Sequence, residues 1–255
     1  MQVEVVTLFP EVFPGPLGVG VVGRAIERGQ LQVRAHDLRG HGVGPHRQVD
    51  DEPFGGGPGM VLRPEPIFAA VRALRADRSQ PVGRAILLGA HGRRFDAAAA
   101  RRLAAEPRLI LICGRYQGVD ERVVEGCGLE EVSVGDFVLS GGELAAMVVI
   151  EAAARHLPGT LGAPESLHDE SFTKGGVEHP HYTRPAVFED RAVPEVLRSG
   201  DHAAIARWRL QAAGERALRL RPDLLGRDPG PGRAGDPSAP APEVSALAAA
   251  PGGRP

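Results

Sequence analysis

Cysteine and lysine are both scarce in this sequence of 255 residues. Cys113 and Cys127 are the only cysteines, and no Cys-x-x-Cys motif or Cys/His cluster occurs. These absences argue against a disulfide scaffold and a structural zinc site, so no metal ligands are predicted. Lys174 is the single lysine among the 30 basic residues, and the abundance of alanine and glycine indicates that coding bias explains the preference for arginine.

Long apolar runs and a strong net charge are also absent. No apolar stretch reaches the roughly 18 residues of a membrane span, and the start, MQVEVVTLFP, lacks the pattern of a signal peptide. The net charge is −2, so any surface that binds nucleic acid must be local. The sequence therefore predicts an ordinary globular protein that is cytoplasmic and has no membrane partner.

Up to about residue 160, short runs typical of strands alternate with helical patterns. The expected strands cover residues 3–8, 31–38, 85–90, 108–114 and 131–139. The expected helices cover residues 18–29, 64–76, 95–105, 119–126 and 142–157. This alternation predicts an α/β fold with a mainly parallel sheet that is covered on both faces.

After Pro158-Gly159 the pattern changes. Residues 160–185 show no clear period, whereas residues 194–227 read as helices with Asp201 as an N-cap. The chain beyond is rich in Pro, Gly and Ala, so it buries too little apolar surface to offset the entropy of folding. We therefore expect four segments, namely an α/β domain at 1–160, a linker at 161–177, a small all-α domain at 178–227 and a disordered tail at 228–255.

Two glycine-containing turns follow expected strands. Segment 111–123, LICGRYQGVDERV, passes from a buried strand through Gly114 and Gly118 to a helix expected to begin at Asp120. In segment 132–147, VSVGDFVLSGGELAAM, glycines alternate with apolar residues, which suits the faces of an adenine better than a phosphate. Ligands commonly bind at the carboxyl ends of parallel strands, and glycine lets them approach the backbone. An ordinary strand-to-helix connection is the alternative for both.

Three polar segments each have a structural and a functional interpretation. The loop 49–60, VDDEPFGGGPGM, has two aspartates, four glycines and two prolines, and this composition is typical of a flexible surface loop. As a functional alternative, a phosphate-binding loop is excluded, because the lysine and the spacing of that motif are missing. Segment 205–227 has six arginines against two acids, which suits either an RNA surface or a solvated helix with Trp208 in its core. The loop 165–172, ESLHDESF, is either solvated or holds a working carboxylate.

Seven segments carry a family resemblance across residues 1–225: TLFPEVF (7–13), GRAIERG (23–29), HRQVDDEPFGGGPGM (46–60), LICGRYQGVDERV (111–123), VGDFVLSGGELAAM (134–147), PHYTRP (180–185) and DHAAIARWRL (201–210). Together they resemble the bacterial tRNA (guanine-N1)-methyltransferases of the SPOUT superfamily. The resemblance implies an enzyme that uses S-adenosylmethionine to methylate N1 of the guanosine 3′ of the tRNA anticodon, position 37. That modification helps maintain the reading frame.

The resemblance also implies features of the fold and of the cofactor site. It implies a deep trefoil knot at the end of the α/β domain, which the general rarity of knots argues against. It further implies a homodimer with active sites shared between the two chains. Loops resembling 87–92, 112–118 and 132–142 would hold the cofactor. The implied cofactor-binding residues are Leu87, Leu88, Gly114, Tyr116, Gln117, Val134, Gly135, Asp136, Phe137, Val138, Leu139, Gly141 and Gly142.

Catalytic and substrate-binding roles follow from the same resemblance. Counting back from Ser171-Phe172 makes Glu170 the base that removes the proton of guanine N1, or Asp169 if the loop shifts by one residue. Arg155 would stabilise the negative charge that grows on guanine O6. Magnesium dependence is also implied, although no metal-ligand spacing indicates it. The implied substrate-binding residues are Asp50, Gly59, Ser171, His181, Tyr182, Arg184, Arg207, Trp208 and Arg209.

Three positions depart from the family pattern. Gln117 stands where glutamate is usual, Glu52 replaces a frequent arginine, and Ala90 stands where proline is common. Alternative functions are another SPOUT-type RNA methyltransferase that acts on a different RNA site, and a non-catalytic RNA-binding protein of the same fold. A nucleotide-binding protein is disfavoured because the phosphate-binding loop is missing.

Overall fold

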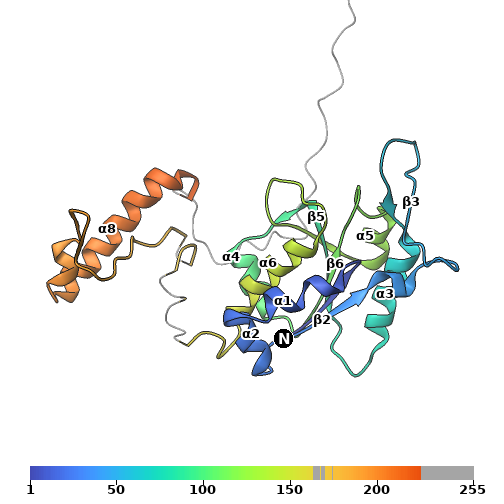
Figure 1. The fold of residues 1–255 in the computed structure, drawn as a ribbon, viewed down its shortest axis with the longest axis horizontal. Coiled ribbons are helices and arrows are strands. Elements are labelled where there is room, and N and C mark those ends of the chain that lie inside the picture. The colour runs from blue at the N-terminus through green and yellow to red at the C-terminus, as the bar shows by residue number, and fades with distance from the viewer. Residues whose placement is uncertain (163–166, 168–169, 174, 225–255) are drawn as a thin grey trace, which may run out of the picture.

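The centre of the protein is a five-stranded parallel sheet. The computed structural model describes residues 1–162, 167, 170–173 and 175–224 (Figure 1). The strand order is β2-β1-β6-β5-β7, which confirms the predicted α/β fold with a parallel sheet. The five strands are β1 (Gln2–Thr7), β2 (Gln32–Asp37), β5 (Arg84–Arg94), β6 (Arg108–Cys113) and β7 (Glu130–Ser133). Two short antiparallel pairs join β3 (Asp50–Asp51) to β4 (Val61–Leu62) and β8 (Val187–Phe188) to β9 (Arg191–Ala192).

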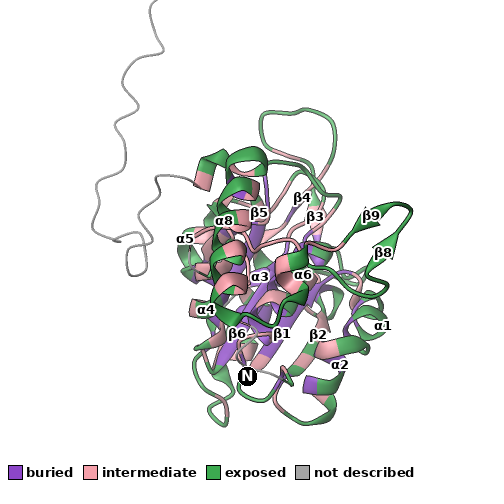
Figure 2. Ribbon diagram, turned by 90° about the vertical axis from the view of Figure 1, so that its left-hand side faces the viewer, coloured by how far each residue is buried: buried purple, intermediate pink, exposed green. Residues whose placement is uncertain are grey.

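Helices cover both faces of the sheet, because alternate strand side chains point to opposite sides. On β6, Leu109 and Leu111 belong to one buried cluster, whereas Ile110 and Ile112 belong to the other. The first cluster includes residues of α1 (Pro14–Leu17), α2 (Gly20–Glu27), α4 (Ala97–Ala104) and α6 (Glu143–Ala154). The second includes residues of α3 (Pro64–Ala76) and α5 (Arg122–Cys127). Figure 2 shows these buried strands at the centre of the molecule.

Strand β7 is shorter than the predicted 131–139. It ends at Ser133, whose hydroxyl donates to the Gly135 carbonyl at 3.0 Å and accepts from the Gly135 amide at 3.3 Å. This turn takes the backbone out of the sheet, so residues 134–139 form a loop at the carboxyl end of the strand. Strand β5, in contrast, extends past its predicted end to Arg94.

Helix α3 has its predicted bounds, whereas α5 begins later than predicted. The carbonyl and carboxylate of Asp120 accept hydrogen bonds from the amides of Val123, at 2.9 Å, and Arg122, at 3.0 Å. These bonds form a turn ahead of the helix, so the first helical residue is Arg122 rather than Asp120. The other helices predicted before residue 160 are also shorter than expected at their ends.

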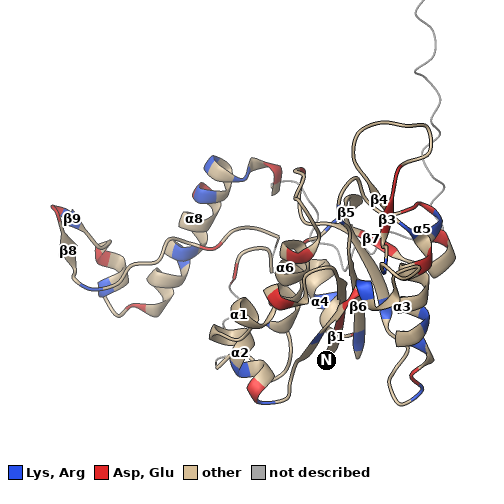
Figure 3. Cartoon of the chain, turned by 45° about the vertical axis from the view of Figure 1, so that its right-hand side comes forward, with Lys and Arg blue, Asp and Glu red and all other residues tan. Residues whose placement is uncertain are grey.

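Three helical elements lie within the described residues 195–224: η3 (Glu195–Arg198), α8 (His202–Leu220) and η4 (Pro222–Leu224). Asp201 is the N-cap of α8, as predicted, because its carboxylate accepts hydrogen bonds of 3.0 Å from the amides of Ala203 and Ala204. Figures 1 and 3 show α8 and the β8–β9 hairpin standing apart from the sheet. The predicted tail lies outside the described residues, and the domain bounds stay predictions.

Candidate functional site

A cavity of about 390 Å³ lies at the carboxyl ends of β5, β6 and β7. Its walls come from three stretches of chain, within residues 87–91, 114–124 and 131–145. This is the edge at which parallel α/β proteins usually bind their ligands. The volume also falls in the range of about 300–1,000 Å³ that is typical of small-molecule sites.

Most of the predicted cofactor-binding residues meet at this cavity. Twelve of the thirteen line it: Leu87, Leu88, Gly114, Tyr116, Gln117, Val134, Gly135, Phe137, Val138, Leu139, Gly141 and Gly142. Asp136 is the exception. Sequence reasoning did not select six lining residues with polar side chains, which are His91, Arg115, Glu121, Glu131, Ser133 and Ser140. Arg115 and Glu121 lie within segment 111–123, but no local pattern distinguishes them from ordinary loop residues.

Two glycines let the loops after β6 and β7 pass close together. A Cβ atom on Gly142 would lie 2.7 Å from the Cys113 Cα, and the Gly142 amide donates to the Gly114 carbonyl at 2.9 Å. A Cβ atom on Gly141 would lie 2.4 Å from the Arg115 Nε. A larger residue at either position would force its neighbours to move. The glycines therefore form a thin wall where a ligand can approach the backbone.

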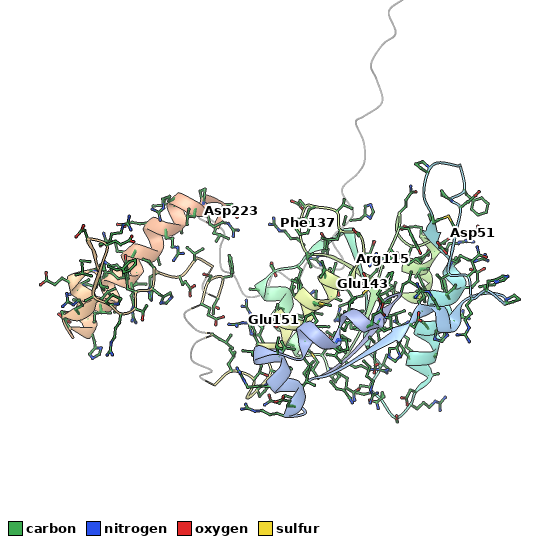
Figure 4. The ribbon with its side chains drawn as sticks, in the orientation of Figure 1. Asp51, Arg115, Phe137, Glu143, Glu151 and Asp223 are labelled. Atoms are coloured by element: carbon green, nitrogen blue, oxygen red, sulfur yellow. The ribbon has the colours of Figure 1, made fainter. Side chains whose placement is uncertain are left out.

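Apolar side chains form the mouth of the cavity. Phe137, Val138 and Leu139 are 56%, 87% and 37% exposed, and Tyr116 is 53% exposed. Figure 4 places Phe137 on the loop that follows β7. Flat apolar and aromatic surfaces beside open backbone suit a ligand with a heteroaromatic ring. The wall of glycines and this apolar mouth together suit a ligand with a flat ring.

A buried hydrogen-bonded ion pair supports the cavity. Glu143, in the first turn of α6, is 4% exposed and accepts a hydrogen bond of 2.8 Å from the Thr7 hydroxyl. Its carboxylate lies 3.3 Å from the Arg115 Nε, and the Arg115 guanidinium lies 4.3 Å from the centre of the Phe9 ring (Figure 4). A carboxylate at a helix N-terminus is also favoured by the helix dipole. These contacts join β1, the loop after β6 (residues 114–119) and α6. Sequence reasoning missed them.

The glycine-rich loop 49–60 is hydrogen-bonded to Gln117, which lies in the loop after β6 (residues 114–119). The Gln117 backbone amide donates to the Met60 carbonyl at 3.1 Å, and its side-chain amide donates to the Pro58 carbonyl. Gly59 has a φ of 94°, and a Cβ atom there would lie 2.8 Å from the Gln117 Nε2. The departure to glutamine therefore supplies a donor that a glutamate carboxylate lacks.

Arg155 and Glu170, two of the three predicted catalytic residues, are in direct contact. Arg155 directly follows α6, and its guanidinium donates a hydrogen bond to the Glu170 carboxylate. The side chains are 34% and 32% exposed. Nearby, burial lowers the pKa of His156, and the charges of Arg101 and Arg155 add to this effect. The third predicted residue, Asp169, lies outside the described residues.

The predicted substrate-binding residues fall into two groups, and Ser171 lies in the segment between them. Asp50 lies on β3 and Gly59 on the loop tied to Gln117, so both belong to the α/β part of the molecule. The Ser171 hydroxyl accepts a hydrogen bond of 3.1 Å from the Glu178 amide. The second group, on α8 and the segment before β8, is His181, Tyr182, Arg184, Arg207, Trp208 and Arg209. Figures 1 and 3 show this region apart from the sheet, so one chain does not gather both groups at one place.

Trp208 lies in an aromatic cluster rather than on an open surface. Its ring is 6.3 Å from that of Tyr182 and 6.4 Å from that of His179, and the side chain is half-buried. His179 in turn lies 4.5 Å from the His181 ring. These contacts favour a packing role for Trp208 over stacking on a base.

Metal-ligating groups, long apolar helices and cysteines are the remaining features that could indicate a further site. Among the described residues, no group of three or more His, Cys, Asp or Glu side chains is placed to hold a metal ion. No helix in the described part of the chain is long and apolar enough to cross a membrane. Cys113 and Cys127 are buried free thiols, and burial raises the pKa of both.

The fold and the cavity place the chain among α/β enzymes that bind a nucleotide-like ligand at the carboxyl edge of a parallel sheet. Comparison with known families is more specific. The family model described as tRNA (Guanine-1)-methyltransferase TrmD matches residues 1–227, and the chain belongs to this family. The family resemblance of the sequence is thereby confirmed.

Curated relatives agree with the family match. The tRNA (guanine-N(1)-)-methyltransferase of Geobacter metallireducens is 52% identical over 225 residues, which cover 88% of this chain and 91% of the relative. The protein of the same name from Moorella thermoacetica is 51% identical over 227 residues, 89% of this chain and 91% of the relative. That from Rhodopseudomonas palustris strain TIE-1 is 50% identical over 228 residues, with 89% and 91% covered.

Proposed function

We propose that this chain transfers a methyl group from S-adenosylmethionine to N1 of guanosine 37 in tRNA and thereby helps maintain the reading frame. One observation carries the proposal. Twelve residues that the family resemblance marks as cofactor-binding line a single cavity, in a chain whose residues 1–227 match the family model. The residues come from three separate stretches of chain, so their convergence is not a consequence of sequence proximity.

The cavity residues fit the proposed methyl donor. The glycines at positions 114, 141 and 142 leave room for a ligand against the backbone, and the apolar mouth suits the faces of an adenine. Two carboxylates, those of Glu121 and Glu131, also line the cavity and favour a positively charged ligand. When bound, S-adenosylmethionine supplies an electrophilic methyl group on a sulfonium centre.

Arg155 and Glu170 are proposed to act on the guanine. Guanine N1 carries a proton and is a poor nucleophile until that proton is removed, so Glu170 accepts it as general base. Negative charge then grows on O6, where the Arg155 guanidinium stabilises it. In the free chain the two side chains neutralise each other, and a guanosine that enters between them gives each its own partner. Asp169 is the alternative base.

We further propose a homodimer with shared active sites, built on a knotted α/β domain (1–160), a linker (161–177) and a helical tRNA-binding domain (178–227). Two observations support the dimer. The outer face of α6 exposes Leu144 and Val148, at 62% and 49%, one helical turn apart. The predicted substrate-binding residues are also divided between regions that one chain holds apart, and a second chain would bring them together.

The cellular setting follows from the substrate. Because tRNA is the proposed substrate, we propose that the protein works in the cytoplasm. The resemblance also implies magnesium, but the described residues form no cluster suited to a metal, so no step is assigned to it. The residues of this chain perform binding, positioning and proton transfer in the mechanism above.

A direct assay tests the proposed function. Purified protein is incubated with methyl-labelled S-adenosylmethionine and unmodified tRNA that carries guanosine at positions 36 and 37, and the label is mapped by mass spectrometry. The same tRNA with adenosine at position 37 is the matched control. We expect label on N1 of guanosine 37 and none in the control. Absence of label, or label at another nucleotide, would overturn the proposal.

A further inference from the structure

A second cavity, of about 540 Å³, lies beside α8. One arginine from each of three elements lines it: Arg184 from the segment before β8, Arg198 from η3 and Arg209 from α8. His181 and Tyr182 also line it. No Asp or Glu is among the lining residues, so the cavity is surrounded by positive charge. Figure 3 shows this cluster of elements at the end of the molecule far from the sheet.

The three lining arginines differ from Arg191 and Arg221, two arginines of the same region that have acidic partners. Arg191 pairs with Glu189 at 3.1 Å, and Arg221 pairs with Asp223 at 2.8 Å. In the part of the chain that the structure describes, the guanidinium groups of the three cavity arginines make no hydrogen bond and no ion pair. All three are exposed. Like charges around one cavity repel each other, and none of the three guanidinium groups has an acidic partner among the described residues, although the Glu178 carboxylate lies 3.4 Å from the lining His181.

The chemistry of these groups selects the ligand. A guanidinium presents N–H donors in a planar fork that matches the oxygens of a phosphate, which makes arginine the usual residue for phosphate recognition. The cavity lining contains no carboxylate and no side-chain amide, the groups that read cytosine and adenine edges. Arginine can also read guanine, but about half to two-thirds of protein–DNA hydrogen bonds go to phosphate and sugar oxygens, so a cavity lined by three arginines suits a phosphate.

We propose that this cavity binds a backbone phosphodiester of the tRNA, with Arg198 as a phosphate ligand alongside Arg184 and Arg209. The proposal rests on the proposed function, because it takes tRNA as the substrate. Tyr182 lies at the same cavity and packs against Trp208, whose ring centre is 6.3 Å away. The half-buried Trp208 thus positions a cavity residue instead of stacking on a base itself.

Arg198 is the most suitable residue for a test, because it is exposed and its side chain makes no hydrogen bond or ion pair in the described part of the chain. Affinity for tRNA would be measured by fluorescence anisotropy over a series of salt concentrations for Arg198→Ala, Arg198→Lys and the matched control Arg219→Ala. Arg219 is exposed on α8 but does not line the cavity. Affinity for S-adenosylmethionine without tRNA and the melting temperature report on folding.

We expect Arg198→Ala to weaken tRNA binding about tenfold, in line with the loss of a hydrogen bond to a charged group. The slope of log affinity against log salt concentration should fall by roughly 0.7–0.9, the value of one phosphate contact. Arg198→Lys should restore most of the slope, and Arg219→Ala should change neither quantity as much. An equal loss in Arg219→Ala would overturn the proposal, because it would indicate diffuse attraction rather than a defined cavity.

Ethylation interference separates this proposal from the proposed function. Ethylation of individual tRNA phosphates should block binding of the wild-type protein at a discrete position, and Arg198→Ala should lose interference at that position alone. Interference at the same positions in both proteins would overturn the proposal. The proposal would also be overturned if inorganic phosphate competed with tRNA for the wild-type protein while ethylation gave no discrete position of interference. The cavity would then bind a free anion rather than a tRNA phosphate. The footprint depends on binding only, so it stands whether or not guanosine 37 is methylated.

Discussion

The hydroxyl of Thr7 donates a hydrogen bond of 2.8 Å to the buried carboxylate of Glu143, 136 positions further along the chain. The Nε of Arg115, in the loop after β6, lies 3.3 Å from the same carboxylate. One carboxylate thus fixes the end of β1, the loop after β6 and the start of α6. The loop after β6 and the start of α6 contribute residues to the cavity. The shape of the cavity therefore depends on Glu143, which does not line it.

Replacing Glu143 by alanine should reduce both stability and cofactor binding. The change leaves the Thr7 hydroxyl and the Arg115 guanidinium without their shared acceptor, and we expect a loss of about 2–3 kcal/mol in the free energy of unfolding. The cofactor loop should also loosen and weaken S-adenosylmethionine binding. Urea denaturation and calorimetric titration measure the two effects. The control is Glu151→Ala, an exposed glutamate two turns along α6, and an equal loss there would contradict the role given to Glu143.

Gln117→Glu should loosen the glycine-rich loop although it restores the more usual family residue. A carboxylate cannot donate to the Pro58 carbonyl and would repel it, at a cost of about 1 kcal/mol for this exposed contact. We expect faster proteolysis within residues 53–59 and a higher KM for tRNA. Gln80→Glu, on an unrelated loop, controls for the added charge. Unchanged proteolysis would argue that the Gln117 contact does not hold the loop.

Much of the fold could be predicted from local patterns, but the contacts that shape the site could not. The apolar run of β6 and the periodic pattern of α3 depend on neighbouring residues, and both elements form as expected. The end of β7 depends on a turn at Ser133, and a hydrogen bond from the Phe95 amide reaches the same residue from a distant strand. A prediction of strands from the periodicity of apolar residues takes neither contact into account.

The site residues show the same division. The cofactor-binding residues were predicted because the motifs resemble those of a family, and the structure brings twelve of them to one cavity. The contacts of Thr7 with Glu143 and the convergence of Arg184, Arg198 and Arg209 join residues with no shared motif. Most of these residues lie in the motifs that carry the family resemblance, but the motifs do not indicate which residues meet, so only the three-dimensional arrangement reveals these contacts.

Mild acid should weaken the fold through His156. Burial lowers the pKa of this histidine in the folded chain, so the unfolded chain binds the proton more readily. Stability therefore falls as the pH decreases through about 6.5, the ordinary value for histidine, and the effect levels off below the folded-state pKa. We expect His156→Gln to flatten this part of the profile in urea denaturation between pH 5.5 and 7.5. The exposed His46→Gln should keep the wild-type slope, and an unchanged profile in His156→Gln would contradict the prediction.

Arg155→Ala should reduce methyl transfer far more than cofactor binding. Loss of a donor to the growing charge on guanine O6 typically lowers turnover by about 10²–10³. The cavity lining does not include Arg155, so affinity for S-adenosylmethionine should remain near that of the wild type. Single-turnover kinetics and calorimetry measure the two quantities, and Arg101→Ala, which removes a nearby arginine, is the control. A loss of cofactor binding alone would show that the role assigned to Arg155 is wrong.

The choice between Glu170 and Asp169 as the base can be decided by their single amide variants. A general base must be ionised to accept the N1 proton, so transfer by the wild type should fall toward acidic pH. Glu170 already contacts Arg155, the group proposed to face O6, which places its carboxylate near the reacting edge of the guanine. We therefore expect Glu170→Gln to lower single-turnover transfer by about 10²–10⁴ and to remove the acid-side fall, whereas Asp169→Asn keeps that fall. If Asp169→Asn alone flattens the pH profile while Glu170→Gln retains it, Asp169 is the base and the contact of Glu170 with Arg155 serves only to position the arginine.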